Sequence, residues 1–257
     1  LRFVLRRLGR ERIAALLAVR DGEPSALEGA GLPELALSGL EPEAARALVP
    51  ELAPDVVAHL VEAIRGNPLA LEEIPALLSA EQAAGAAPLP EPLPAGAGIT
   101  RAFRLRIAGL ASETARSLVV AAASQHDELG TVLQALPLLG LDTAALDDAE
   151  RAGMIETVGG RLEWRHPLLR SAAYHAASPS ERRSAHRALA QALEGRPDAR
   201  AWHLAAAATG VDELVALELE RVALDARTRR APAVAARTFE RAAELSPHGE
   251  ARSRRLL

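Results

Sequence analysis

The fold is decided by the stretch from residue 154 to residue 170, which reads MIETVGGRLEWRHPLLR. Apolar and polar residues alternate on both sides of Gly159-Gly160, which predicts two short strands. Two consecutive glycines supply the positive φ angles of a type I′ turn, so the strands are expected to form a β-hairpin. Pro167 then opens an apolar helix, because proline is tolerated at the first helical position. A hairpin followed directly by a helix is typical of a winged helix.

The residues before this hairpin show helical periodicity. Ser112 and Asp142-Thr143 are suitable capping residues for two of the helices. Helices are expected over 100–110, 112–124, 129–139 and 143–151. Together with the hairpin and the helix after it, they predict a winged-helix domain over residues 99–177.

The composition favours a mainly α fold. The 257 residues are 49% hydrophobic but only 2% aromatic, and the apolar share is mostly alanine and leucine. Alanine, leucine, glutamate and arginine are strong helix formers, whereas a sheet-rich core needs aromatic and β-branched side chains. We therefore expect sheet structure to be confined to short segments.

Charge and cysteine content exclude several classes of protein. A net charge of −4 gives no general attraction to nucleic acid or anionic lipid. The absence of cysteine excludes disulfides and cysteine-based metal sites. No apolar run is long enough to span a bilayer, and residues 1–7 do not resemble a signal peptide. A cytoplasmic location without membrane contact is expected.

Residues 1–40 are expected to form the end of an α/β domain. A helix is predicted over Leu1–Arg10, and the apolar run Ile13–Val19 is typical of a strand buried on both faces. A second strand is expected over Glu34–Leu37. Arg20 would lie at the carboxyl end of the first strand, where open α/β sheets bind ligands. The simpler interpretation is that Arg20 is a solvated loop residue.

Residues 41–83 are expected to form a helical lid. Pro42 marks a helix start, a second helix should run over Pro54–Arg65 and end at Gly66, and a third should run from Pro68 to about Gln82. Alternating prolines then predict an extended linker over 84–98.

Residues 178–257 are expected to be helical throughout. Ser178 followed by Pro179 is a strong helix start. Small residues around Phe239, followed by Pro247, resemble the second helix of a tetratricopeptide unit. The prediction is a tetratricopeptide-like α-solenoid of degenerate helix pairs.

Two short motifs could carry chemistry. The turn Gly66-Asn67-Pro68 presents backbone and could lie against a purine, although a plain corner between helices is the simpler interpretation of the motif alone. His166, directly before a helix N-terminus, could donate to a phosphate oxygen or simply cap the helix. Trp164 and Trp202 are more typical of core anchors than of ligand platforms.

Complete active sites are absent from the sequence. The chain has no lysine, so the Gly-Lys-Ser/Thr phosphate loop cannot occur, and no acidic run suggests the Walker B carboxylates. There is no His-Glu-x-x-His, no histidine pair at i,i+4 and no Gly-x-Ser-x-Gly. The chain is therefore not expected to be an enzyme or to hold a metal.

The ordered set of segments resembles a known family. It comprises LLAVRDGE (16–23), LSGL (37–40), GNPLAL (66–71), RHPLLRSAAY (165–174), ERRSAHRALA (181–190) and AWHLAAA (201–207). This order is similar to the middle of large LuxR-type transcriptional regulators with a STAND-class ATPase domain, such as the maltose-regulon activator group. The resemblance covers nearly the whole chain, but Walker A, Walker B and the C-terminal helix-turn-helix are missing from the sequence.

The resemblance implies ATP or ADP as cofactor, with magnesium in an intact protein. It implies that Arg20 is the sensor arginine, that Pro68 contacts adenine within the Gly66-Asn67-Pro68 turn, and that His166 faces the bound diphosphate. The chain would couple nucleotide state and an unknown small-molecule or protein inducer to transcription, with DNA bound only through a separate C-terminal domain.

Two other functions remain open. One is a helical-repeat scaffold that binds a protein or peptide and no nucleotide. The other, a DNA-binding winged helix, is disfavoured because the helices over 129–151 carry almost no basic residues. Self-association through an unpaired strand at Ile13–Val19 is also expected.

Overall fold

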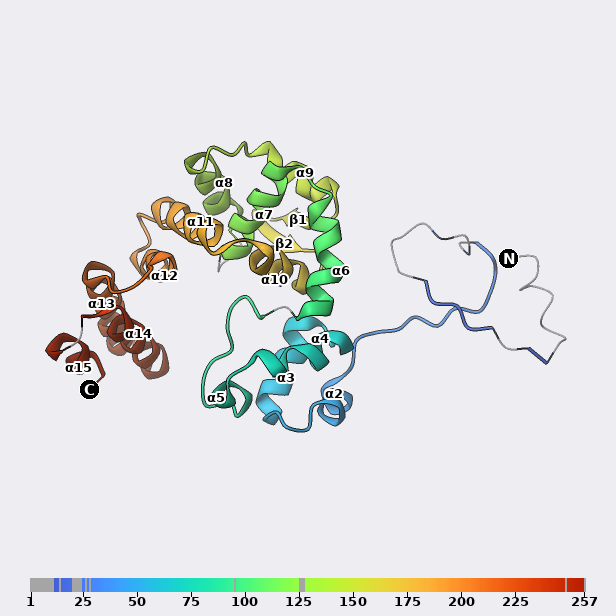
Figure 1. Ribbon diagram of the computed structural model, residues 1–257, viewed down its shortest axis with the longest axis horizontal. Coiled ribbons are helices and arrows are strands. Elements are labelled where there is room, and N and C mark those ends of the chain that lie inside the picture. The colour runs from blue at the N-terminus through green and yellow to red at the C-terminus, as the bar shows by residue number, and fades with distance from the viewer. Residues whose placement is uncertain are drawn as a thin grey trace. The chain divides into compact units, whose positions relative to one another are not determined.

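A computed structural model describes residues 12, 13, 15–19, 25, 27, 29–94, 96–124, 128–247 and 249–256. The chain divides into two compact units, residues 1–38 and residues 39–257. Figure 1 traces the helices and the hairpin of the second unit along the chain.

The first unit does not contain the strands expected there. Residues 13 and 15–19 have no regular secondary structure, and the side chain of Leu16 is 100% exposed. The strand expected over Glu34–Leu37 is also absent, with Leu35 and Leu37 largely exposed. An apolar run becomes a strand only beside a pairing neighbour, and none is found among the described residues of this unit. The expected helix Leu1–Arg10 lies outside those residues.

The second unit is mainly helical, as predicted. Many of its helices begin at a proline, because proline is compatible with the first helical turn. Within the part of the chain that the structure describes, no helix is long and apolar enough to cross a bilayer. The helices are α2 (Pro42–Leu48), α3 (Pro54–Ile64), α4 (Pro68–Glu73), η2 (Pro75–Leu77), α5 (Ala80–Ala83), α6 (Ala97–Ala108), α7 (Ser112–Ala123), α8 (Leu129–Leu138), α9 (Ala144–Arg151), α10 (Pro167–Ala176), α11 (Pro179–Ala192), α12 (Pro197–Ala207), α13 (Glu213–Thr228), α14 (Pro232–Leu245) and α15 (Glu250–Leu256).

Helices α2 to α5 pack around a small core that includes Leu60 and Leu71. The first two of these helices confirm the predicted elements, but the third predicted helix is wrong in length. It is broken into α4, η2 and α5, because Pro75 cannot donate a main-chain hydrogen bond within a helix. Ser79 then starts α5 with a capping box that it forms with Gln82.

The segment predicted as a linker is packed against this bundle. Leu93 is buried in the same core as Leu60 and Leu71. Glu73 accepts a hydrogen bond of 2.7 Å from the main-chain N–H of Gly98, at the start of α6. The segment therefore follows the surface of the bundle instead of acting as a free spacer.

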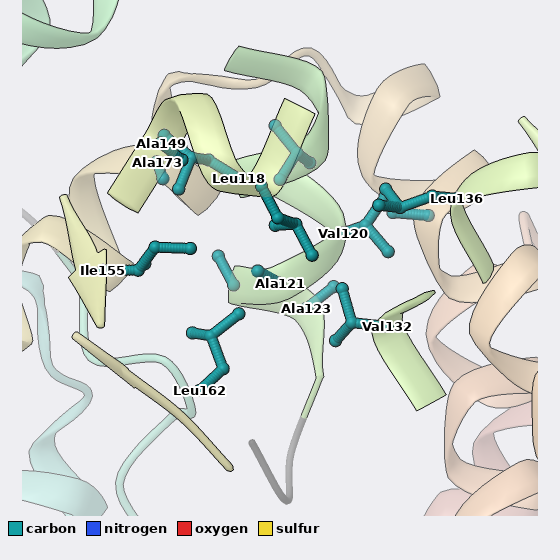
Figure 2. Packing of buried hydrophobic residues seen from close by; sticks show 14 of the residues in the cluster. Leu118, Val120, Ala121, Ala123, Val132, Leu136, Ala149, Ile155, Leu162 and Ala173 are labelled. Atoms are coloured by element: carbon teal, nitrogen blue, oxygen red, sulfur yellow. The ribbon is translucent and has the colours of Figure 1, made fainter. Parts of the chain in front are cut away.

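A second core lies among α7, α8, α9, α10 and α11. Figure 2 shows Leu118 and Val120 of α7 at its centre, with Leu136 of α8 nearby. The two strands β1 (Ile155–Val158) and β2 (Arg161–Trp164) form an antiparallel hairpin that contributes Ile155 and Leu162 to this core.

The hairpin has the predicted turn. Gly159 and Gly160 have φ angles of 59° and 77°, as a type I′ turn requires. An isolated antiparallel bridge between Glu128 and Arg161 joins the start of α8 to the hairpin. The order of elements is thus helix, bridge, helix, helix, hairpin and helix.

The remaining helices, α11 to α15, follow without strands among their described residues. Ser178 starts α11 with a capping box that it forms with Glu181. Helices α13 and α14 pack along each other, and Arg255 of α15 is buried against Glu213 and Glu220 of α13.

Candidate functional site

The turn that ends α3 is held by a close approach of two backbone segments. Arg65 and Gly66 adopt left-handed conformations, with φ angles of 52° and 62°. The main-chain N–H of Leu40 donates to the carbonyl of Gly66 over 2.8 Å. A Cβ atom at Gly39 would lie 1.9 Å from the carbonyl oxygen of Arg65. Glycine is therefore required at 39 and 66, and this side of the turn is covered by backbone.

The other two residues of the motif have different environments. The Asn67 side chain accepts a hydrogen bond of 3.1 Å from the N–H of Ala70 and so caps α4. Pro68 occupies the first position of α4 and is exposed. Of the three motif residues, only Pro68 presents an open side-chain surface that a flat ring could contact.

His166 caps α10. Its Nδ1 accepts a hydrogen bond of 3.1 Å from the N–H of Leu168, two residues into the helix. An accepting Nδ1 is unprotonated, so the neutral ring carries its proton on Nε2. The Phe103 ring of α6 lies beside it, with centroids 5.9 Å apart. The capping interpretation of His166 is thus satisfied through one nitrogen, which leaves Nε2–H as a donor for a different partner.

Arg65 connects the end of α3 to the start of α10. Its Nη1 donates to the carbonyl oxygen of Arg165 over 3.4 Å. Burial lowers the pKa of His166 from its usual value, and the nearby positive charge of Arg65 lowers it further. Both effects favour the neutral ring that the cap requires.

A cavity of about 420 Å³ adjoins this junction. It is lined by residues of α3, the segment 90–93, β2 and the first turns of α10. These residues are His59, Ala63, Ile64, Arg65, Pro90, Glu91, Pro92, Leu93, Arg161, Leu162, Glu163, Trp164, Pro167, Leu168, Arg170 and Ser171.

Cationic side chains outnumber anionic ones in this lining. The lining includes Arg65, Arg161 and Arg170, but only two carboxylates, those of Glu91 and Glu163. Arg170 is fixed by donating to the carbonyl oxygens of Ala122 and Ser124, over 3.2 and 2.7 Å. A rigid guanidinium with further N–H groups suits an anionic oxygen ligand.

Trp164 belongs to the same wall. The residue is 9% exposed and packs in the second core, as expected for an anchor. Its indole Nε1 is buried without a hydrogen-bond partner among the described residues. A buried donor left unpaired costs about 1–3 kcal/mol, and because this nitrogen has almost no accessible surface, it is not assigned to the binding of a ligand. Trp202 is only partly buried, against the core of α12 to α14.

The structure brings some of the predicted site residues together. Arg65, which precedes Gly66, contacts the carbonyl of Arg165, which precedes His166, so the two motifs adjoin at the junction of α3 and α10. The cavity itself is lined by neither Gly66, Asn67, Pro68 nor His166. Arg20 lies outside the described residues, so its role stays a prediction. Sequence reasoning missed Arg65 and Arg170, although Arg65 directly precedes one quoted motif and Arg170 lies within another.

No group of three or more histidine, aspartate or glutamate side chains in the described ranges is arranged to hold a metal ion. Compared with known proteins, the chain matches no family model, no curated protein and no solved structure.

Proposed function

We propose that this chain is the regulatory portion of a STAND-type transcriptional regulator of the LuxR family, with α2–α5 as lid, residues 99–177 as winged helix and α11–α15 as tetratricopeptide-like repeats. The resemblance of the ordered segments supports this proposal. So does the order of helix, bridge, two helices and hairpin, which is the order expected for the proposed winged helix. The cytoplasm is the proposed location.

The observation that carries the proposal is the contact between α3 and α10. Arg65 binds the carbonyl of Arg165, and His166 keeps its Nε2–H free of the helix cap. In this proposal, an arginine of the lid contacts the main chain beside His166 of the winged helix, and a phosphate group that accepts from both side chains could strengthen the junction. The same junction would weaken when the phosphate is removed or moved.

A nucleoside diphosphate would bring two phosphate groups and a purine to this junction. Arg65 and the Nε2–H of His166 would donate to phosphate oxygens, and the exposed ring of Pro68 would contact the base. Holding these residues together would favour the closed packing, and an inducer bound elsewhere would shift the population toward an open one. Hydrolysis is not assigned to the chain, because its sequence lacks a phosphate loop.

Trp164 provides the test, because it lines the cavity beside Arg65. The chain has two tryptophans, so Trp164 is the only tryptophan that remains after the substitution Trp202→Phe. Magnesium-ADP should change its fluorescence saturably with a weak dissociation constant, on the order of 1 mM, equivalent to about −4 kcal/mol.

Two variants make this titration specific. Arg65→Gln removes the proposed phosphate donor and should abolish saturation. Arg46→Gln removes an exposed arginine from the last turn of α2 in the same bundle and should leave the titration unchanged. A flat titration of the parent, or equal loss in both variants, would refute nucleotide binding at this junction.

The second candidate function is a helical scaffold that binds a protein or peptide. It is favoured by Leu214, Leu217 and Leu224, which are exposed on α13 at helical spacing. An exposed apolar stripe on a packed helix pair is a common surface for partner binding. In the titration above, this function predicts no response of Trp164 to nucleotide.

A further inference from the structure

Three side chains form a hydrogen-bonded chain through the interior of α10, α11 and α12. The Tyr174 hydroxyl of α10 lies 2.9 Å from Nε2 of His186 in α11. Nδ1 of His186 lies 2.8 Å from Nδ1 of His203 in α12. The rings also contact each other, with centroids 5.8 Å apart for the first pair and 5.1 Å for the second.

The two histidines are deeply buried. His186 is 6% exposed and His203 is 2% exposed, while Tyr174 is half-buried. Helical spacing places His186 on the same face as Ala185 and Leu189, which belong to the second core. Polar rings at such positions are stable only when their nitrogens are paired.

The charged side chains nearest to Tyr174 and His186 are arginines. Arg182 of α11 lies over the Tyr174 ring, 5.3 Å from its centroid, and its charge acts on His186. The charge of Arg170, from α10, also acts on Tyr174. On α12, Arg200 is paired with Glu218 of α13 at 2.6 Å. No carboxylate among the described groups compensates a positive charge on His186.

The contact between the two Nδ1 atoms limits how many protons His186 and His203 can hold together. With both rings neutral, one Nδ1 donates and the other accepts, and the Tyr174 hydroxyl can act in either direction. One added proton is still accommodated, because His186 can donate from both nitrogens to Tyr174 and His203. A second proton places an N–H on both Nδ1 atoms, so that two donors and two positive charges face each other at 2.8 Å.

Burial, and to a smaller extent the charge of Arg182, lower the pKa of His186 from 6.5 to about 4. The unfolded or opened chain therefore takes up a proton before the packed one does. The stabilising effect is fully present above pH 6.5 and is lost as the pH falls toward about 4. Acidification thus acts against the packing of α12 on α11.

We propose that Tyr174, His186 and His203 form a proton-sensitive contact that fastens α12 to α11 and releases it when both imidazoles are protonated. The contact lies where the winged-helix region ends and the repeat region begins, so the proton would control how firmly α12 is attached to the helices before it. This inference does not depend on nucleotide binding.

Amide hydrogen exchange of the whole chain tests the contact. Exchange rates of residues 197–207, corrected for the intrinsic effect of pH, should rise at least about tenfold between pH 7.5 and 5.0, because the open state can bind a proton on each imidazole, whereas the packed contact does not hold both protons. Residues 54–64 and 112–123 should keep their protection, because the release is local. Equal loss of protection in all three helices would overturn the proposal, since it would mean general acid unfolding.

Two variants identify the responsible ring. His203→Gln keeps a hydrogen-bonding group opposite His186 but cannot become charged, so only the proton taken up by His186 remains, and the rise in exchange over residues 197–207 should be at least about tenfold smaller than in the wild type. His59→Gln removes an exposed histidine of α3 and should retain the wild-type response. A response in His203→Gln as large as that of the wild type, or no response in the wild type, would overturn the proposal.

Nitrogen NMR of the histidine rings covers the case in which His203→Gln does not fold. At pH 7.5 the wild-type spectrum should show one protonated and one unprotonated Nδ1 for the pair His186 and His203. Two rings that titrate independently near pH 6.5 would contradict the contact.

Discussion

Arg65 donates from Nη1 to the main-chain carbonyl of Arg165 over 3.4 Å, across a separation of 100 residues in the sequence. Both partners adjoin a motif: Arg65 precedes Gly66-Asn67-Pro68, and Arg165 precedes His166. The left-handed conformation of Arg65 ends α3 and orients the next residues into α4. The contact is exposed and modest in strength, so a ligand that adds charge-assisted bonds could readily alter it.

Replacing Gly39 should destabilise the bundle of α2 to α5. A Cβ atom at this position would approach the carbonyl carbon and oxygen of Arg65 to 2.8 and 1.9 Å, so the two backbone segments must separate. We expect Gly39→Ala to lower the free energy of unfolding by about 2–3 kcal/mol. Urea unfolding followed by circular dichroism measures the change.

Gly130→Ala is the matched control. Gly130 lies in α8, and a Cβ atom there would meet nothing within 4 Å. Alanine should therefore raise the free energy of unfolding by about 0.5–1 kcal/mol. If Gly39→Ala has an effect as small as that of Gly130→Ala, the close backbone approach is not a stabilising feature of the protein.

Arg255 should determine whether α15 stays attached. Its side chain is only 1% exposed, and it pairs with Glu213 and Glu220 at 2.8 Å and with the Ser246 hydroxyl. Arg255→Gln would leave two carboxylates without their shared cation. Hydrogen exchange over residues 250–256 should then increase by at least about tenfold.

Arg254→Gln provides the comparison for this prediction. Arg254 is 63% exposed and lies 3.8 Å from Glu220, so its loss should have little effect on exchange. Similar exchange in both variants would mean that α15 is held by contacts other than the buried guanidinium.

Residues 1–38 should be dispensable for the fold of residues 39–257. They form a separate unit, and Leu16, Leu35 and Leu37 expose more than four-fifths of their surface. Deleting them should preserve the helical content of the remainder and reduce self-association, because exposed apolar side chains promote it. Light scattering and circular dichroism measure the two properties. Loss of helical structure after the deletion would show that this unit supports the core.

Several elements followed directly from local sequence. The hairpin was predictable because Gly159-Gly160 permits the two positive φ angles of a type I′ turn. Helix α11 was predictable because Ser178, Pro179 and Glu181 satisfy its first turn. Both signals come from residues close together in sequence, so they can be recognised without knowledge of the tertiary structure.

Other features depend on contacts between distant residues. An apolar run such as Ile13–Val19 is compatible with a buried strand, but only a pairing neighbour can make it one. Pro75 lies inside the third predicted helix, but the prediction gave more weight to the apolar periodicity of the segment. The missing N–H of Pro75 prevents the continuous helix.

The histidine contact illustrates the same difficulty. His186 and His203 each lie among alanines and leucines on an apolar helix face, which is a signal for a buried polar residue. Their meeting requires the packing of α12 on α11, which neither helix specifies alone. The cavity at the junction of α3 and α10 is likewise built from segments about 100 residues apart.

His166 allows the capping role to be separated from the proposed switching role. His166→Ala removes both the cap and the imidazole, and should cost about 1 kcal/mol of stability. His166→Asn keeps an N-cap acceptor for Leu168 but removes the Nε2–H. The asparagine variant should therefore be as stable as the wild type.

The most direct measurement of the proposed function is reporter transcription by the intact regulator carrying His166→Asn, without inducer and normalised to protein level. If His166 stabilises the nucleotide-bound closed state, a bond worth about 1.5–3 kcal/mol is lost, and basal transcription should rise about tenfold or more. Normalised transcription equal to or below that of the wild type would contradict the account.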